Sequence, residues 1–179
     1  LEKSGMDFAI QDGEGAFYGP KIDITVPDAL GREWQLGTVQ LDFFASDKFN
    51  LNYINKDGNK ENVVLIHRAI FGSLERFFGI LIEHFGGSFP LWLSPDQFSL
   101  IPISENHFEE CSTIKKNLLS CGLRGEADLS NDRFNNKIRK AQQMKTPLMI
   151  IVGDKEVENN SLTIRLRNGQ NLNDIKLKK

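Results

Sequence analysis

The period of the hydrophobic pattern changes once along the 179-residue chain, and this change restricts the fold more than any other feature. Before the proline-flanked segment 88–95 (SFPLWLSP), β-rich runs and turn signals predict an antiparallel sheet followed by one helix. After this segment, strands alternate with helices. We therefore expect a mixed α/β (α+β) protein of two domains, residues 1–94 and residues 95–179. The second should be a small α/β sandwich around a parallel or mixed sheet.

The predicted elements follow from local patterns. In the first half, residues 13–26 and 32–43 flank the turn-like string PDALG, and residues 51–67 form a second pair of strands around KDGN. In the second half the expected strands are 98–104, 124–129, 147–153 and finally 161–169, and the expected helices are 107–122 and 134–144.

The apolar run 66–85 is the length of a membrane span, but charged residues interrupt it. We therefore expect a buried helix rather than a membrane-spanning one. Gly72 and Ser73 predict its start, with Ser73 as the N-cap, and Gly86–Gly87 predicts its end.

Charge divides along the same line as the hydrophobic pattern. Residues 1–94 hold 8 basic and 13 acidic side chains, a net charge of −5, whereas residues 95–179 hold 14 and 11, a net charge of +3. Within the second half, residues 131–145 form a basic cluster. From charge alone, this cluster is either a patch that neutralises nucleic-acid phosphates or an ordinary solvated helix face.

Cysteine usage and the chain start restrict the setting. Cys111 and Cys121 form no CxxC motif and no disulfide framework, which favours a reducing intracellular compartment, so we expect a cytoplasmic protein without membrane contact. No secretory signal and no initiator Met are visible at the start, so we expect a piece of a longer protein.

Arg76 and His67 are the first candidates for chemistry. Arg76 lies one turn into the apolar helix, near its N-terminus, where unpaired N–H groups favour an anion such as a nucleotide triphosphate. The alternative is an ion pair with Glu75 or Glu83. If His67 serves the same pocket, it must belong to the preceding strand, because nine residues on one helix would place it on the opposite face.

The remaining candidates allow two interpretations each. His67 is either a hydrogen-bonded histidine or one ligand of a metal site that this chain does not complete. Lys21, Gln35 and Gln40 lie in predicted strands and face either a polar pocket or water.

Taken together, these strings resemble the threonyl-tRNA synthetases, a family of class II aminoacyl-tRNA synthetases. GSLERF is similar to the third motif of that class, whereas YGPKID, WQLGTVQLDF and IHR are typical of the threonyl family. The resemblance continues through GDKEVE and RLRNG, so it extends over essentially the whole chain.

The resemblance implies a threonine–tRNA ligase that uses ATP with magnesium to activate threonine and then transfers it to threonine tRNA. It implies that Arg76 is catalytic, contacting the ATP phosphates, and that His67 is one of three protein ligands of a zinc ion that selects threonine. Such an enzyme is expected to be a homodimer. The implied ATP and threonine pocket consists of Tyr18, Lys21, Gln35, Thr38, Gln40 and Ser73.

The second half resembles the anticodon-binding domain of this class. The resemblance implies that base edges are read by Asn131, Arg139, Glu156 and Arg165, and that the RNA backbone is held by Arg133, Lys137 and Lys145. Glu156 is informative because a carboxylate in a basic surface suits the donors of a guanine better than it suits phosphate.

The chain lacks the first two class II motifs and the other two zinc ligands of the family. We therefore expect the isolated chain to be inactive as a ligase. Two alternatives stay open: a synthetase-like module that binds tRNA without catalysis, and another enzyme of the same subclass, such as a prolyl or glycyl enzyme.

Overall fold

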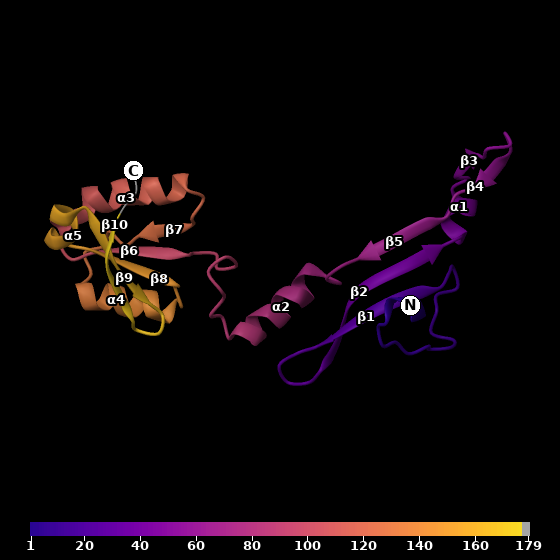
Figure 1. The fold of residues 1–179 in the computed structure, drawn as a ribbon, viewed down its shortest axis with the longest axis horizontal. Coiled ribbons are helices and arrows are strands. Elements are labelled where there is room, and N and C mark those ends of the chain that lie inside the picture. The colour runs from indigo at the N-terminus through magenta and orange to yellow at the C-terminus, as the bar shows by residue number, and fades with distance from the viewer. Residues whose placement is uncertain (177–179) are drawn as a thin grey trace. The chain divides into compact units, whose positions relative to one another are not determined.

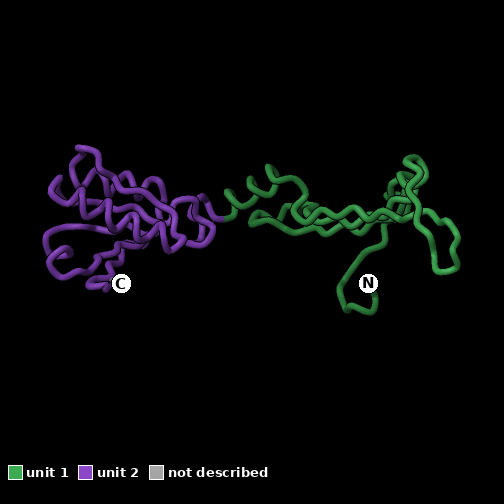
Figure 2. The backbone as a smooth tube through the Cα atoms, turned by 90° about the horizontal axis from the view of Figure 1, so that it is seen from above, with its two compact units in different colours: residues 1–84 green, residues 85–179 purple. Residues whose placement is uncertain are grey.

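The structure is a computed structural model that describes residues 1–176. Its contacts divide the chain into two compact units, residues 1–84 and the residues from 85 onward, which are described separately below (Figure 2). Within the described residues, every helix is too short or too polar to cross a membrane.

Unit 1 is built on a three-stranded antiparallel sheet in the order β1-β2-β5 (Figure 1). Strands β3 and β4 form a separate hairpin. The strands are β1 (Lys21–Pro27), β2 (Glu33–Asp42), β3 (Asn52–Ile54), β4 (Lys60–Asn62) and β5 (Leu65–Ala69), and the helices are α1 (Phe44–Lys48), α2 (Leu74–Phe85) and a 3₁₀ turn at Glu2–Ser4. The antiparallel sheet and the hairpin confirm the predicted type of fold for the first half.

The unit 1 sheet has two different faces. We call the side chains of Ile22, Ile24, Val39 and Ile66 the apolar face, because cross-strand pairing places them on one side. Ile22, Ile24 and Ile66 are 44%, 54% and 64% exposed. Leu36 is the single buried apolar side chain in residues 1–84, all of which the structure describes. No hydrophobic layer of unit 1 covers this face.

Helix α2 begins and ends where the sequence predicts. The Ser73 hydroxyl accepts a hydrogen bond of 3.1 Å from the Arg76 N–H, which is the predicted N-cap. Gly86 and Gly87 follow the last helical residue with φ values of 53° and 76°, a conformation that favours glycine. The expectation of a buried helix was wrong, because α2 contains no buried residue and Leu74 is 79% exposed. Within residues 1–84, nothing large enough to bury its apolar side packs on it.

Unit 2 is a five-stranded mixed sheet in the order β10-β9-β8-β6-β7, with α3 and α4 on opposite faces (Figure 1). β6 pairs in parallel with β7 and β8, and the other pairs are antiparallel, so the predicted α/β sandwich is confirmed. Its strands are β6 (Phe98–Pro102), β7 (Gly125–Ala127), β8 (Leu148–Val152), β9 (Ser161–Leu166) and β10 (Asn171–Lys176), and its helices are α3 (Phe108–Ser120), α4 (Phe134–Gln143), α5 (Asp154–Asn159) and a 3₁₀ turn at Glu105–His107.

The core of unit 2 has one layer on each face of its sheet. On the α3 side, Phe98 and Leu100 of β6 pack with Cys111 and Ile114 of α3. On the α4 side, a second cluster joins the sheet to the helix; it consists of Ile101, Met149 and Ala141 with Phe134 and Ile138. Alternate residues of one strand therefore serve opposite layers, as in a sheet that is covered on both faces.

Two elements of unit 2 were not predicted. Helix α5 has the sequence DKEVEN, which is too short and too polar to show a helical period. Its N-terminus is capped by Glu156, whose carboxylate accepts the Gly153 N–H at 3.1 Å. Strand β10 is an edge strand of mostly polar residues with an irregular register, so it lacks the alternation that marks a half-buried strand. The strand predicted to be the last one, β9, therefore continues into a hairpin.

The proline-flanked segment 88–95 belongs to unit 2 and is held in place by other side chains of that unit. The Arg124 guanidinium donates to the carbonyl oxygens of Trp92, Ser94 and Pro95, at 2.8 to 3.2 Å. The Gln97 side chain adds a bond of 2.9 Å to the Leu91 carbonyl. These bonds fix the conformation of residues 91–97.

Candidate functional site

The candidate pocket residues of unit 1 meet on the other side of its sheet from the apolar face. We call Lys21, Asp23, Thr38, Gln40 and His67 the polar face. Cross-strand pairing aligns them in two rows, Lys21–Gln40–His67 and Asp23–Thr38–Ala69. Neighbours in such rows have their side chains within reach of one another. The structure therefore brings together four of the residues predicted from the sequence, and it adds Asp23.

A β-bulge brings Gln35 to the same face. Ile24 pairs with Gly37 and Thr25 pairs with Gln35, which leaves Leu36 as the extra residue. In a regular strand, residues 35 and 38 would point to opposite faces. With the bulge, the Gln35 amide reaches the Thr38 hydroxyl at 3.0 Å and the Asp23 carboxylate at 2.7 Å.

Asp23 is at the centre of this network. Its carboxylate also accepts from the Thr38 hydroxyl at 2.7 Å and pairs with the Lys21 ammonium at 2.6 Å. Partial burial raises the pKa of Asp23, but the hydrogen bonds from Lys21 and Thr38 outweigh it and hold the pKa below its ordinary value. The hydrogen bond to Asp23 in turn raises the pKa of Lys21. Both groups therefore carry charge at neutral pH.

Tyr18 joins the polar face at the Gln40 end. Its hydroxyl donates to the Gln40 side-chain oxygen at 3.2 Å. Its backbone carbonyl accepts the Phe43 N–H at 3.0 Å, which holds the loop before β1 against the end of β2. Tyr18 and Gln40 thus lie together at one end of the polar face.

His67 lies in the middle of β5 and pairs with Asp42. The His67 Nε2 atom lies 2.9 Å from the Asp42 carboxylate, whose other oxygen accepts the Phe44 and Ala45 N–H groups at the start of α1. The Ala45 hydrogen bond and then the His67 bond lower the pKa of Asp42. An ionised Asp42 favours the imidazole tautomer that has its proton on Nε2, which leaves Nδ1 available to a ligand.

No metal centre is formed by this chain alone, since residues 1–176 contain no group of three or more His, Cys, Asp or Glu side chains placed to hold an ion. His67 nevertheless fits the role of a single ligand. Its side chain is 56% exposed, and its second ring nitrogen is oriented by a carboxylate, which is the usual arrangement of metal-bound histidines.

Arg76 lies on the first turn of α2, next to Gln35. Its guanidinium is exposed and lies 3.4 Å from the Gln35 carbonyl oxygen. Glu83, one of the two ion-pair partners considered above, pairs with Arg32 instead. Glu75, the other candidate, forms no ion pair with Arg76 either, so within residues 1–176 the Arg76 charge is available to an anion.

The candidate RNA-reading residues of unit 2 lie partly together. Arg165 pairs with the buried Met149 across β8 and β9, so it lies on the α4 side of the sheet. Thr163 is two residues away on the same side, and its hydroxyl donates to the Glu156 carboxylate at 2.8 Å. The Arg165 Nε–H is buried without a hydrogen-bond acceptor among the described residues.

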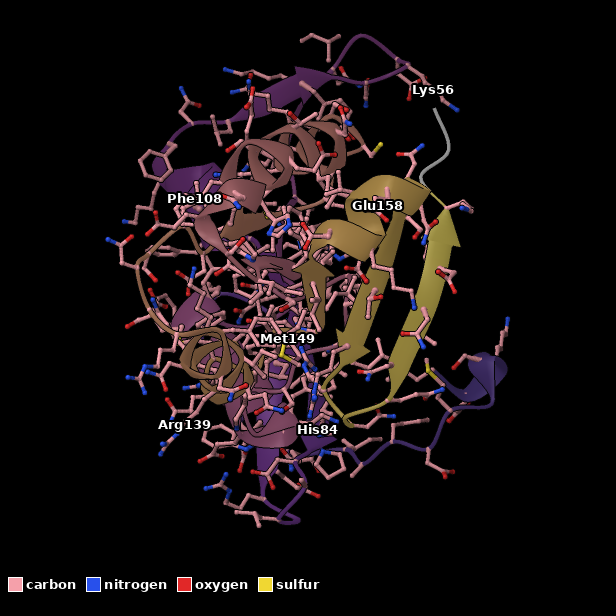
Figure 3. All side chains as sticks on the ribbon, turned by 90° about the vertical axis from the view of Figure 1, so that its left-hand side faces the viewer. Lys56, His84, Phe108, Arg139, Met149 and Glu158 are labelled. Atoms are coloured by element: carbon pink, nitrogen blue, oxygen red, sulfur yellow. The ribbon has the colours of Figure 1, made fainter. Side chains whose placement is uncertain are left out.

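Arg139 and Asn131 are exposed, Arg139 on α4 and Asn131 in the loop before it. Figure 3 shows Arg139 directed outward, whereas Met149 lies in the interior of unit 2. The structure does not join these two residues to Glu156 or Arg165 by any hydrogen bond within residues 1–176.

Lys137 is not where its predicted role requires it. It is 4% exposed, its ammonium donates to the Asp128 carbonyl at 2.9 Å, and it lies over the Phe108 ring at 5.2 Å. Lys145, which follows α4, is exposed, and its ammonium donates one hydrogen bond to the Gly86 carbonyl. Lys137 is buried because it occupies an inward position of the amphipathic helix α4, as Ala141 does. Arg133, at the exposed start of α4, remains accessible.

Asp23 is the residue that sequence reasoning missed. The sequence does indicate that Asp23 shares a face with the candidate Lys21, because these two residues alternate with Ile22 and Ile24. The sequence does not predict which residue of β2 pairs with Asp23, because the register of β1 and β2 depends on the bulge at Leu36.

Two family models match the chain, one on each part. The model described as "tRNA synthetase class II core domain (G, H, P, S and T)" matches residues 2–85. The model described as "Anticodon binding domain" matches residues 97–179.

Curated relatives are similar over nearly all of this chain but are much longer. The threonine–tRNA ligase of Thermotoga petrophila is 50% identical over 177 residues, which is 99% of this chain and 28% of the relative. The threonine–tRNA ligase of Acetivibrio thermocellus is 49% identical with the same coverage. The chain thus spans 28% of the length of these two relatives.

Solved structures agree with these similarities. The RNA binding domain of threonyl-tRNA synthetase from Cryptosporidium parvum Iowa II has a TM-score of 0.86 at 40% identity, over 96% of this chain and 44% of that one. The putative threonyl-tRNA synthetase of Aeropyrum pernix has a TM-score of 0.67 at 32% identity, over 99% of this chain and 42% of that one.

Proposed function

Because the chain belongs to the threonyl-tRNA synthetase family, we propose that it is the part of such an enzyme that joins the end of the class II core to the anticodon-binding domain. The full enzyme would activate threonine with ATP and magnesium and transfer it to threonine tRNA. A prolyl or glycyl enzyme is disfavoured, since the relatives at about half identity are threonine–tRNA ligases.

The observation that carries this proposal is the polar face. Three strand segments place lysine, aspartate, threonine, glutamine and histidine side chains side by side, and Gln35 links this face to Arg76. A surface on which a few polar groups converge suits a small polar substrate. The exposed Arg76, beside the N-terminus of α2, would contact the ATP phosphates and stabilise the charge that develops as pyrophosphate leaves.

His67 would supply one of three zinc ligands, and the other two would come from outside this chain. Bound zinc would select threonine by accepting its amino and hydroxyl groups as ligands, which valine cannot match. In this chain, Asp42 would keep the His67 ring in the tautomer that presents Nδ1. Ser73 would act in the pocket chiefly by starting α2, and Tyr18 would orient Gln40.

Unit 2 would read the anticodon from the α4 side of its sheet. Glu156 and Arg165, with Asn131 and Arg139, would contact bases, and Arg133 would hold a phosphate. The unsatisfied Arg165 Nε–H supports this assignment, since a buried donor without an acceptor costs about 1–3 kcal/mol and a ligand can supply the acceptor. Lys137 has a structural role in this proposal, because its ammonium is used within the unit.

We further propose the domain boundary at residues 94 and 95, a homodimeric enzyme and a cytoplasmic location. This boundary lies in the segment 86–96 that separates the two family matches. The contacts divide the chain earlier, at residues 84 and 85, because Arg124 bonds the segment up to Pro95 to unit 2.

The test is threonine-dependent ATP–pyrophosphate exchange and tRNA charging by the full-length protein that carries this sequence. We expect activity in that protein and none in the 179-residue chain. Replacing Arg76 with Ala should lower kcat by about 100- to 1000-fold, the range measured when one group that stabilises developing charge is removed.

Arg68, which lies on the opposite side of β5 from His67, provides a matched control. Arg68→Ala should retain activity. A full-length protein that binds threonine tRNA but does not exchange pyrophosphate would instead support a non-catalytic tRNA-binding module.

A further inference from the structure

The Asp23 carboxylate contacts three side chains that the resemblance assigns to the ATP and threonine pocket. One oxygen accepts from the Gln35 amide and the Thr38 hydroxyl, both at 2.7 Å. The other oxygen pairs with the Lys21 ammonium at 2.6 Å. The side chains of Asp23 and Lys21 are 26% and 28% exposed, so the cluster is accessible to a small ligand.

The backbone makes this convergence specific. Asp23 pairs directly with Thr38, Lys21 is two residues away on the same face, and Gln35 arrives through the bulge at Leu36. A shift of the register by one residue would move Asp23 to the apolar face. The carboxylate therefore depends on the bulge for its contact with Gln35, and Gln35 depends on the carboxylate for its orientation.

The direction of the hydrogen bonds follows from the chemistry of the groups. An ionised carboxylate only accepts, so the Gln35 NH₂ group must face Asp23 and the Thr38 hydroxyl must donate its proton there. The second Gln35 N–H is used by the Thr38 oxygen. The Gln35 side-chain oxygen is thus turned away from the cluster and accepts no hydrogen bond within residues 1–176.

We propose that Asp23 is a positioning residue of the ATP and threonine pocket, which fixes the Gln35 oxygen as an acceptor and the Lys21 ammonium as a donor toward the substrate. This inference rests on the proposed function. The Gln35 oxygen suits an N–H donor, such as the ammonium of an amino acid or the amine of adenine. The remaining Lys21 N–H bonds suit a carboxylate or phosphate oxygen. A substrate that carries both kinds of group is expected.

The decisive variant is Asp23→Asn in the full-length enzyme. An asparagine amide can donate as well as accept, so Gln35 is free to reverse and Lys21 loses its ionic partner. We expect the KM for threonine or for ATP to rise about tenfold or more, the scale of one charge-assisted hydrogen bond, with a smaller change in kcat. Asp23→Glu keeps the charge and should recover part of the loss.

Asp57→Asn is the matched control, because it makes the same charge change in the turn between β3 and β4. It should leave both kinetic parameters unchanged. An Asp23→Asn enzyme with KM values within about twofold of the original would overturn the inference, since a lost charged hydrogen bond costs more than this. An equal fall of kcat in the Asn and Glu variants would indicate a merely structural role and would also overturn it.

A second measurement does not depend on activity. In the full-length protein, the Gln35 side-chain amide protons should be protected from exchange, and Asp23→Asn should remove this protection. Unprotected Gln35 protons in the unaltered chain would exclude the arrangement. If the full-length protein shows no threonine-dependent exchange, the proposed function fails, and the amide measurement still decides whether Asp23 orients Gln35.

Discussion

The two sheets of this chain differ in how they are covered. In unit 2, helices cover both faces, and Leu100, Ile101 and Met149 are fully buried. In unit 1, Ile24 and Ile66 on the apolar face are more than half exposed. Apolar burial is the main stabilising contribution to folding, at about 25 cal/mol per Å². Unit 2 therefore holds the means of its own stability, whereas unit 1 has a sheet suited to a further hydrophobic layer.

Polar clusters take a larger part in holding unit 1 together. Asp28 accepts from the Leu30 and Arg32 N–H groups, the Arg32 guanidinium and the Trp34 indole, all at 2.6 to 2.9 Å. Arg32 in turn pairs with Glu83 of α2. The Trp34 hydrogen bond in particular holds the pKa of Asp28 far below its ordinary value, although partial desolvation opposes this shift. The turn between β1 and β2 and the helix α2 are thus joined through the Arg32 guanidinium, which pairs with both Asp28 and Glu83.

The largest effect is expected from Leu100→Ala compared with Ile24→Ala. Leu100 is fully buried, so its truncation removes apolar burial and leaves a cavity, at about 2–5 kcal/mol. Ile24 is 54% exposed, and its truncation should cost less than about 1 kcal/mol. Urea unfolding followed by amide hydrogen exchange in each unit measures both values. Similar costs for the two variants would mean that the apolar face is covered in solution.

The next effect concerns Asp42→Asn in the full-length enzyme. Asn can still cap α1, but its amide now donates toward His67 Nε2, so the ring proton must move to Nδ1. We expect zinc affinity to fall about 10- to 100-fold, as for other lost outer-shell partners. Zinc titration measures the affinity, and ¹⁵N shifts of the His67 ring report the tautomer.

Glu83→Gln serves as a control, because it also removes a carboxylate that has a basic partner in unit 1. It should leave zinc affinity unchanged. If Asp42→Asn shifts the tautomer without changing zinc affinity, His67 does not bind the metal through Nδ1.

Sequence reasoning succeeded where a local pattern decides the outcome. The N-cap at Ser73, the glycine stop after α2 and the alternating strands of unit 2 all follow from short-range rules. It failed where distant residues decide. The bulge at Leu36 brings Gln35 to Asp23, and no local signal predicts which strand partner a carboxylate meets.

Burial was the least predictable property. Helix α2 has an apolar side, but whether it is buried depends on a layer that residues 1–84 do not contain. Lys137 shows the opposite error, because a lysine in a basic cluster is expected at the surface, whereas Lys137 is buried on the inner side of α4. Composition gives the charge of a helix, and only packing gives the direction in which each residue points.

A smaller effect separates Lys137 from Arg133 in unit 2. Lys137→Ala removes the bond to the Asp128 carbonyl and the contact with Phe108, so it should lower the stability of unit 2 by about 1–3 kcal/mol. Its effect on the salt dependence of threonine tRNA binding should be small. Arg133→Ala should leave stability within about 0.5 kcal/mol and reduce the salt slope by about 1.

These two variants are controls for each other, measured by urea unfolding and by tRNA binding over a range of salt concentrations. If Lys137→Ala preserves stability but reduces the salt slope, its ammonium contacts phosphate after all. The buried position would then belong only to the RNA-free state.

The smallest effect is a difference in acid sensitivity between the units. The pKa values of Asp23 and Asp28 lie below the ordinary 3.8, so these carboxylates stabilise unit 1 fully above about pH 5. This contribution is lost as the pH falls below 3.8 through the lower folded-state values, because the unfolded chain then binds more protons. The pKa of Asp128 in unit 2 is also lowered, but the core of unit 2 is apolar on both faces of its sheet. NMR signals of β1 and β2 should therefore weaken before those of β6 and β8. Asp28→Asn should weaken unit 1 already at neutral pH and reduce its further change with acid. If both units lost their signals at the same pH, the carboxylate clusters would not be what distinguishes them.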